Sequence, residues 1–159
     1  MPFVIDGHNL LWSIQKGLED SGSIAAVRLC HIIGRYLKLA GENGEIVFDG
    51  AGPPDKVRFE GIGNLEVFFA GPGMDADAVI EEKIRASTAP RRLTVVSSDR
   101  QLRRAARARK AIVVKSEAFW SEVERRLSRG KSSKEPAAKR QGISESETEQ
   151  WLKFFGFEQ

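Results

Sequence analysis

Five short runs of β-branched and aromatic residues alternate with longer amphipathic stretches along most of the chain. The runs, which predict strands, cover residues 2–5, 45–48, 65–70, 92–96 and 111–114. Apolar residues at three- and four-residue spacing predict helices over 23–40, 75–87, 99–109 and 117–129. Strands that are apolar throughout and separated by helices are typical of a parallel sheet covered on both faces. The sequence therefore predicts a three-layer, Rossmann-like α/β fold with about five mainly parallel strands.

Composition excludes several classes of protein. The 159 residues suit one domain with a short appendage. A single cysteine, Cys30, excludes an intramolecular disulfide, and one cysteine with two histidines is too few for a zinc ribbon. No apolar run approaches the roughly 20 residues of a membrane span, so we expect no membrane partner. The first residues carry no basic region before an apolar stretch, which predicts a cytoplasmic protein.

The last thirty residues differ from the rest. Residues 1–129 are predicted to form the α/β domain, and the polar, basic residues 130–143 a flexible linker. Ser144 and Glu147 have the spacing of a capping box, and aromatic residues follow, which predicts a short aromatic helix over 144–159. This helix either docks on its own domain or anchors the chain in a groove of a partner.

Charge is distributed unevenly along the chain. Residues 1–90 carry 8 Lys and Arg against 13 Asp and Glu, a net charge of −5. Residues 91–140 carry 16 against 5, a net charge of +11. Acids that hold a metal beside bases that hold phosphate would produce this asymmetry, and so would a solvated basic surface helix.

Four aspartates are placed to meet at one edge of the sheet. Asp6 and Asp49 end the first two predicted strands, Asp77 opens the helix after the third strand, and Asp99 follows the fourth. Ligands of open parallel sheets bind at the carboxyl ends of the strands. Each aspartate also has a structural interpretation, because the first two precede glycines in turn-like sequences and the other two can cap helices.

Several carboxylates in one site repel one another unless a cation compensates. Oxygen ligands without His or Cys suit Mg²⁺ or Mn²⁺. Clusters that hold two such ions about 4 Å apart commonly hydrolyse phosphodiesters.

Other polar residues flank these aspartates. Glu81 is a candidate accessory acid, or an ion-pair partner of Arg85 one turn later. Asp75 is a second candidate accessory acid, or the N-cap of its helix. Asn9 is predicted to lie in a loop, where it binds a ligand or holds the strand-end aspartate. His8 is interpreted as a turn residue rather than a general base.

A basic stripe follows Asp99. On the predicted helix, arginines at i, i+3, i+4 and i+7 share one face: Arg100, Arg103, Arg104 and Arg107. Ser98 lies at the start of this helix, where backbone N–H groups attract phosphate. Such a surface would bind a nucleic-acid backbone without reading bases.

Four segments together resemble the NYN domain of the YacP-like family, which belongs to the PIN-like nucleases. They are VIDGHNLL (4–11), VFD (47–49), ADAVIE (76–81) and VVSSDR (95–100), and the resemblance covers residues 2–129. It implies a Rossmann-like sheet, a divalent metal and endoribonuclease activity. Some bacterial members act in RNA decay in association with ribosomes, so the resemblance implies RNA, and the ribosome, as partners.

The resemblance also implies residue roles. By position, Asp6, Asp77 and Asp99 would bind the metal, Asn9 would complete the first motif, and Asp49 would be an accessory acid. The resulting hypothesis is a metal-dependent endoribonuclease that uses Mg²⁺ or Mn²⁺. The alternatives are an RNA- or ribosome-binding adaptor that does not cut and, less favoured by the arginine stripe, a phosphohydrolase of small substrates.

Overall fold

A five-stranded parallel sheet forms the centre of the computed structural model, which describes residues 2–14 and 22–132. The strands lie in the order β3-β2-β1-β4-β5. They are β1 (Pro2–Asp6), β2 (Asn43–Phe48), β3 (Leu65–Phe69), β4 (Thr94–Val96) and β5 (Ile112–Val114). The predicted fold class and the five predicted strands are confirmed.

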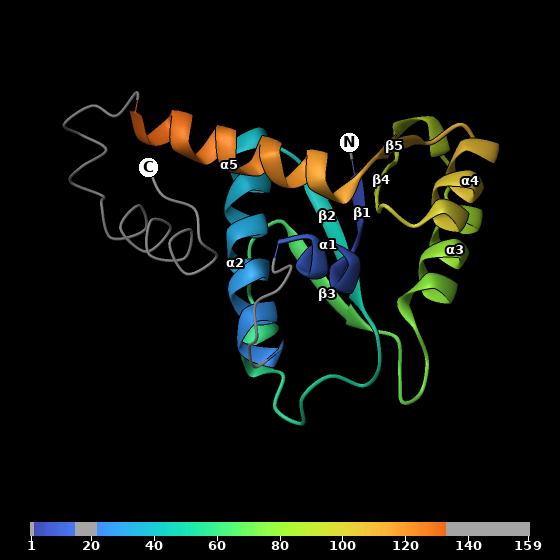
Figure 1. Ribbon diagram of the computed structural model, residues 1–159, viewed down its shortest axis with the longest axis horizontal. Coiled ribbons are helices and arrows are strands. Elements are labelled where there is room, and N and C mark those ends of the chain that lie inside the picture. The colour runs from blue at the N-terminus through green and yellow to red at the C-terminus, as the bar shows by residue number, and fades with distance from the viewer. Residues whose placement is uncertain (1, 15–21, 133–159) are drawn as a thin grey trace.

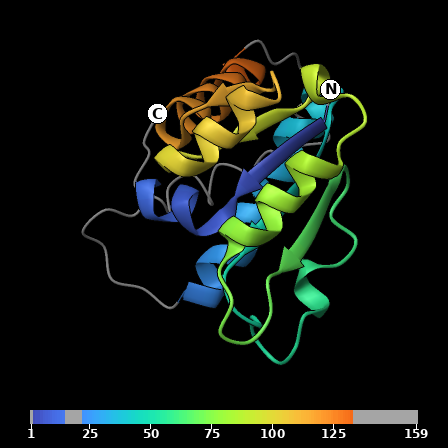
Figure 2. The ribbon, with the colours of Figure 1, turned by 90° about the vertical axis from the view of Figure 1, so that its right-hand side faces the viewer.

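Helices cover both faces of this sheet. One face carries α1 (Gly7–Ile14), α2 (Gly22–Ala40) and α5 (Ser116–Ser132), and the other carries α3 (Ala76–Ala86) and α4 (Arg100–Ala108) (Figure 1). Figure 2 shows the second face, with α3 in front of the strands. Two single 3-10 turns, Val57–Phe59 and Pro90–Arg92, lie in the connections. Among the helices of the described part of the chain, none has the length and apolar character to cross a membrane.

Burial on both faces explains the unbroken apolar strands. In β1, Val4 packs into the core under α3 and α4, whereas Ile5 packs into the core under α1, α2 and α5. In β4, Val95 and Val96 divide between the two cores in the same way. Successive strand residues point to opposite faces, so a strand covered on both faces needs apolar residues at every position.

The order of the strands places a topological switch point at the end of β1. The chain passes from β1 to β2 through α1 and α2 on one face, and from β3 to β4 through α3 on the other. Strand β1 therefore lies between β2 and β4, and the direction of winding reverses beside it. In open α/β sheets, ligands bind at the carboxyl ends of the strands at such a reversal.

The short helix α1 was not predicted. His8 and Asn9, interpreted as turn and loop residues, lie in its first turn, directly after β1. Leu10 and Leu11 are buried in the core, and their burial stabilises a helix that is too short to be stable by itself. Gly7 at the start of α1 resembled a turn signal, but it is buried against Phe48.

The end of the described chain differs slightly from the prediction. Helix α5 continues to Ser132, three residues beyond its predicted end at 129. The rest of the predicted linker, and the predicted aromatic helix over 144–159, lie outside the described residues.

We expect Gly7→Ala to destabilise the protein. An ideal Cβ at Gly7 would lie 2.5 Å from Cε1 of Phe48, so the ring or α1 must shift. Alanine normally stabilises a helix relative to glycine, so a loss of about 1–3 kcal/mol in the free energy of unfolding would show that the clash dominates. Urea denaturation measures it. Gly63→Ala is the matched control, because a Cβ at Gly63 meets nothing within 4 Å and should change stability little. Equal stabilities of the two variants would contradict the argument.

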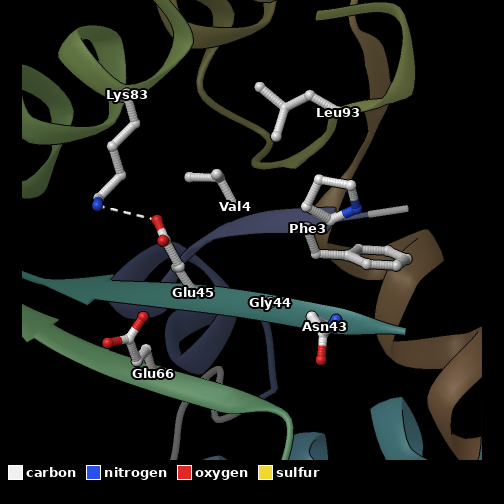
Figure 3. Close-up of a pocket in the computed structure, with 9 residues that line it drawn as sticks. Phe3, Val4, Asn43, Gly44, Glu45, Glu66, Lys83 and Leu93 are labelled. Atoms are coloured by element: carbon white, nitrogen blue, oxygen red, sulfur yellow. Dashed lines mark ion pairs between the residues drawn. The ribbon is translucent and has the colours of Figure 1, made fainter. Parts of the chain in front are cut away.

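A lysine near the C-terminal end of helix α3 links the helix to the sheet. The ammonium group of Lys83 lies 2.9 Å from a carboxylate oxygen of Glu45 on β2 (Figure 3). The same ammonium group lies 3.9 Å from the centre of the Phe68 ring on β3. An ion pair and a cation–π contact thus join one helix to two strands. Because Asp77 lies in the first turn of α3, these contacts also help to position that carboxylate.

Candidate active site

Asp6 is a buried carboxylate, only 5% exposed, at the end of β1. The backbone N–H of Asn9 donates to Oδ1 at 3.3 Å, and the hydroxyl of Ser97 donates to Oδ2 at 3.2 Å. Burial above all, with smaller contributions from the charges of Asp77 and Asp49, raises the pKa of Asp6 to about 7, although both hydrogen bonds act to lower it. The Asp6 carboxylate is therefore costly to ionise unless positive charge lies nearby.

Asp77 shows that the acids lie within electrostatic range of one another. Burial raises the pKa of Asp77, and negative charges raise it further, those of Asp99, Asp75, Asp49 and Glu81 in decreasing order. These residues come from the ends of β2 and β4 and from α3. The structure thus places all six predicted acids at one edge of the sheet.

Asp49 caps helix α3 from a neighbouring strand. Its Oδ1 accepts the N–H of Ala76, the first residue of α3, at 2.6 Å. Asp75 occupies the N-cap position, but its side chain forms no capping hydrogen bond and is exposed. The prediction that Asp75 is the N-cap of its helix is therefore confirmed in position, although a carboxylate from the end of β2 supplies the capping hydrogen bond.

Asp99 and Ser97 connect the end of β4 with the end of β1. Oδ1 of Asp99 accepts the N–H of Leu102, which makes Asp99 the N-cap of α4, as predicted. The buried hydroxyl of Ser97 donates to Asp6 and accepts the N–H of Asp99 at 3.0 Å. One hydroxyl therefore links two of the predicted metal ligands.

Asn9 links three segments of the chain. Its Oδ1 accepts the backbone N–H of Ser98 at 2.8 Å and the hydroxyl of Ser116, at the start of α5, at 2.6 Å. The hydroxyl of Ser98 donates to Glu117 and accepts the N–H of Ser116. The N–H and the hydroxyl of Ser98 are thus engaged within the protein, and phosphate binding by this residue stays a prediction. Asn9 holds Asp6 through its backbone, one of the two predicted roles.

We expect Asn9→Ala to destabilise the protein by about 1–3 kcal/mol, because two donors around it would lose their acceptor. The free energy of unfolding from urea denaturation tests this expectation. The control is Gln101→Ala, which removes an exposed amide that donates to Glu81 and should change stability by no more than about 0.5 kcal/mol. Equal losses in both variants would contradict the role given to Asn9.

The predicted ion pair between Glu81 and Arg85 is absent from the contacts of the described residues. Arg85 instead contacts Glu82 at 2.8 Å, and Glu81 accepts the side-chain amide of Gln101 on α4 at 3.1 Å. Arg85 could pair on the helix with the residue four positions before it or with the residue three positions before it. The packing of α4 against α3 favours the second pair, because it engages Glu81 with α4. Glu81 consequently faces α4 and the acids and keeps its place as a candidate accessory acid.

His8 has a partner that sequence reasoning missed. Its Nδ1 accepts the backbone N–H of Asp49 at 2.9 Å, across 41 positions in the sequence. Because that nitrogen accepts, the neutral ring carries its proton on Nε2. The 3.6 Å approach of the Asp49 carboxylate to the same Nδ1 is then not an ion pair. No local signal reveals this contact, because it depends on β1 and β2 being neighbours.

The arginine stripe starts at the same edge of the sheet. Leu102 and Ala106 of α4 are buried in the core, and three arginines of the predicted stripe are exposed: Arg100, Arg104 and Arg107. Arg103 is half-buried, and its Nε has no hydrogen-bond partner among the described residues. Arg100 directly follows Asp99, whereas Arg107 lies about 10 Å further along the helix. The stripe therefore leads away from the acids.

The donors at this edge suit a hard divalent cation. They are carboxylate oxygens, which Mg²⁺ and Mn²⁺ prefer. The raised pKa values of Asp6 and Asp77 come partly from the repulsion that a cation would relieve. Within residues 2–14 and 22–132, however, no three His, Cys, Asp or Glu side chains gather closely enough to hold an ion. The acids are thus electrostatically coupled without forming a closed ligand cage.

Comparison with known proteins extends these observations. The family model of the YacP-like NYN domain matches residues 3–155. The chain belongs to this family. It is therefore a member of the PIN-like ribonucleases. The match passes beyond residue 129, where the predicted resemblance ended, and includes most of the segment interpreted as linker and aromatic helix. A search of curated protein sequences finds no match.

Two solved structures support the same fold. The crystal structure of Rae1 (YacP) from Bacillus subtilis is 23% identical with a TM-score of 0.70, and the match covers 98% of this chain and 92% of that one. The crystal structure of its W164L mutant is 20% identical with a TM-score of 0.63, and the match covers 87% and 88%. Identities this low establish the PIN-like fold of the YacP-like NYN domain here and leave the chemistry to the residues.

Proposed function

We propose that this YacP-like NYN domain is a metal-dependent endoribonuclease that hydrolyses RNA phosphodiester bonds. The observation that carries the proposal is the set of mutually repelling carboxylates at the carboxyl end of β1 and its neighbouring strands. A cationic helix begins at the same edge. A site that hydrolyses phosphodiesters needs carboxylates to bind the metal ion and basic side chains to bind the phosphates, and both lie at this edge of the sheet.

Asp6, Asp77 and Asp99 are the residues we assign to one or two Mg²⁺ or Mn²⁺ ions. A bound ion would activate water and stabilise charge on the phosphate. Asp49 uses one oxygen to cap α3, so its second oxygen is the one that can act as an accessory acid. Asp75 and Glu81 extend the negative rim, and Asn9 and Ser97 keep Asp6 in position.

We assign RNA rather than a small phosphorylated molecule as the substrate, because the positively charged side chains form a stripe along the helix. Arg100, Arg103, Arg104 and Arg107 follow α4 for two turns, which suits successive phosphates of a polymer. Phosphate contacts provide affinity and position without base sequence. We extend the proposal to the ribosome as the place where RNA is presented, on the strength of the family resemblance.

An endonuclease assay tests the proposal. The full chain is incubated with single- and double-stranded RNA and with translating ribosomes, in Mg²⁺, in Mn²⁺ and in EDTA. We expect metal-dependent internal cuts that leave 5′-phosphate and 3′-hydroxyl ends. Cutting that persists in EDTA would contradict the metal requirement, and RNA that is bound but never cut would contradict the nuclease.

One observation favours a second candidate, an RNA- or ribosome-binding adaptor that does not cut. The described residues contain no group of three close metal-ligating side chains. The adaptor predicts salt-sensitive RNA binding through α4 that is indifferent to divalent metal. The same assay, read together with binding in EDTA, separates the two.

A further inference from the structure

A pocket of about 350 Å³ lies next to the acids. Its wall is aromatic, built from Phe48 at the end of β2, Phe59 in the loop that follows β2, and Phe69 at the end of β3. Ala26 of α2 closes it on another side, and His8 and Asp49 form its polar part. Because Asp49 also belongs to the coupled acids, the pocket and the proposed active site share a boundary.

The rings of the wall hold one another in place. Phe48 and Phe69, paired in the register of β2 and β3, are stacked with centroids 5.7 Å apart. Phe59 meets Phe69 edge to face at 5.2 Å, and His8 meets Phe48 edge to face at 5.4 Å. The pocket is therefore a preformed aromatic site rather than a gap between mobile chains.

Polar groups at the pocket suit the edge and the phosphate of a nucleotide. Nδ1 of His8 accepts the backbone N–H of Asp49, so Nε2 is the ring nitrogen that can donate to a ligand. The Asp49 carboxylate is an acceptor. The ammonium group of Lys56 lies 5.4 Å from the centre of the Phe69 ring, where Pro53 O accepts from it at 3.0 Å. His8 and Asp49 thus place a donor and an acceptor at the apolar wall, and the Lys56 cation lies over the Phe69 ring without lining the pocket itself.

We infer that this pocket is a nucleobase subsite, which takes one unstacked base of a single-stranded RNA. Its position beside the scissile phosphate rests on the proposed function. The volume is at the lower end of the range for small-ligand sites, which begins at roughly 300 Å³, so it suits one base. Phe48 and Phe59 are buried and shape the wall, whereas the half-buried Phe69 offers the ring surface on which a base would stack, whatever its identity. Paired bases cannot enter, so the subsite directs the enzyme to unpaired RNA.

Photocrosslinking tests the subsite without requiring cleavage. The full chain, in EDTA, is irradiated with single-stranded RNA that carries one 5-iodouridine, and the modified peptide is identified by mass spectrometry. We expect crosslinks to His8, Phe59 or Phe69, and their loss in Phe69→Leu, which keeps an apolar wall without the ring. Ala26→Leu, which fills the pocket from α2, should have the same effect. Leu39→Ala, an exposed residue away from the pocket, is the control. Crosslinks only at other aromatic residues, such as the exposed Trp12, would overturn the inference.

Cleavage of abasic RNA separates this inference from the proposed function. One abasic ribonucleotide is moved stepwise along a single-stranded RNA in the presence of Mn²⁺. At one distance between the abasic nucleotide and the cut, we expect the wild type to cleave the abasic RNA about tenfold more slowly than the intact RNA. Ala26→Leu should cleave these two RNAs at nearly the same rate. Normal cleavage at every offset would overturn the subsite and leave the nuclease intact. Crosslinks in the pocket without any cleavage would overturn the nuclease and leave the base site intact.

Discussion

Asp6→Asn and Asp77→Asn are each expected to lower RNA cleavage by about 10³-fold. Both changes keep the size of the side chain and remove a negative charge from the coupled acids. The chain then loses a ligand for the cation and the charge that holds it. RNA binding should be kept or strengthened, because less negative charge faces the phosphates. Initial rates of cleavage in Mg²⁺, with binding measured in EDTA, give the two quantities separately.

Glu82→Gln is the matched control for Asp77→Asn. It removes a carboxylate from the same helix, α3, but Glu82 is exposed and contacts Arg85. We expect its cleavage rate to lie within about twofold of the wild type, since an exposed ion pair contributes little. Unchanged cleavage in both aspartate variants would refute the assignment of the site.

The second large effect concerns stability in the absence of metal. The folded-state pKa of Asp6, about 7, lies above the value of about 3.9 in an unfolded chain. The folded protein therefore binds this proton more tightly, and stability falls as pH rises from about 4 to about 7. A difference of about three pKa units corresponds to on the order of 4 kcal/mol. In EDTA, Asp6→Asn should be more stable than the wild type by about that amount at pH 8.

The two proteins should have similar stabilities at about pH 3, below both pKa values, where Asp6 is mostly protonated whether folded or unfolded, and this comparison is the internal control. Mg²⁺ or Mn²⁺ added at pH 8 should raise the Tm of the wild type and leave that of Asp6→Asn nearly unchanged. A wild type that is more stable than Asp6→Asn at pH 8 in EDTA would contradict the burial argument.

The fold could be predicted because its strongest signals are repeated and local. Val4 and Ile5, or Val95 and Val96, show within two residues that a strand is buried on both faces. Four aspartates lie at strand ends and helix starts. Because parallel strands end at the same edge of a sheet, these aspartates are expected to lie close together. This topology is enough to gather the acids without any knowledge of their contacts.

The contacts themselves depend on packing that no local pattern encodes. Asp49 rather than Asp75 caps α3, because β2 ends beside the start of that helix. The side-chain oxygen of Asn9 accepts hydrogen bonds from Ser98 and Ser116, which lie about 90 and 107 positions away in the sequence. Helix α1 was missed for a related reason, since its stability comes from burial of Leu10 and Leu11 rather than from helix propensity.

The central position of β1 has a consequence for biosynthesis. The N-terminal strand supplies Asp6, but its neighbour β4 and the residues Ser97 and Asp99 leave the ribosome about ninety residues later. Until β4 pairs with β1, the serine that holds Asp6 and the aspartate that completes the acids are missing. A nascent chain that ends in the middle of α3 therefore carries two of the three proposed metal ligands, Asp6 and Asp77, and lacks Asp99. For the nuclease proposed here, the order of synthesis itself would keep the half-made enzyme inactive beside the message that encodes it.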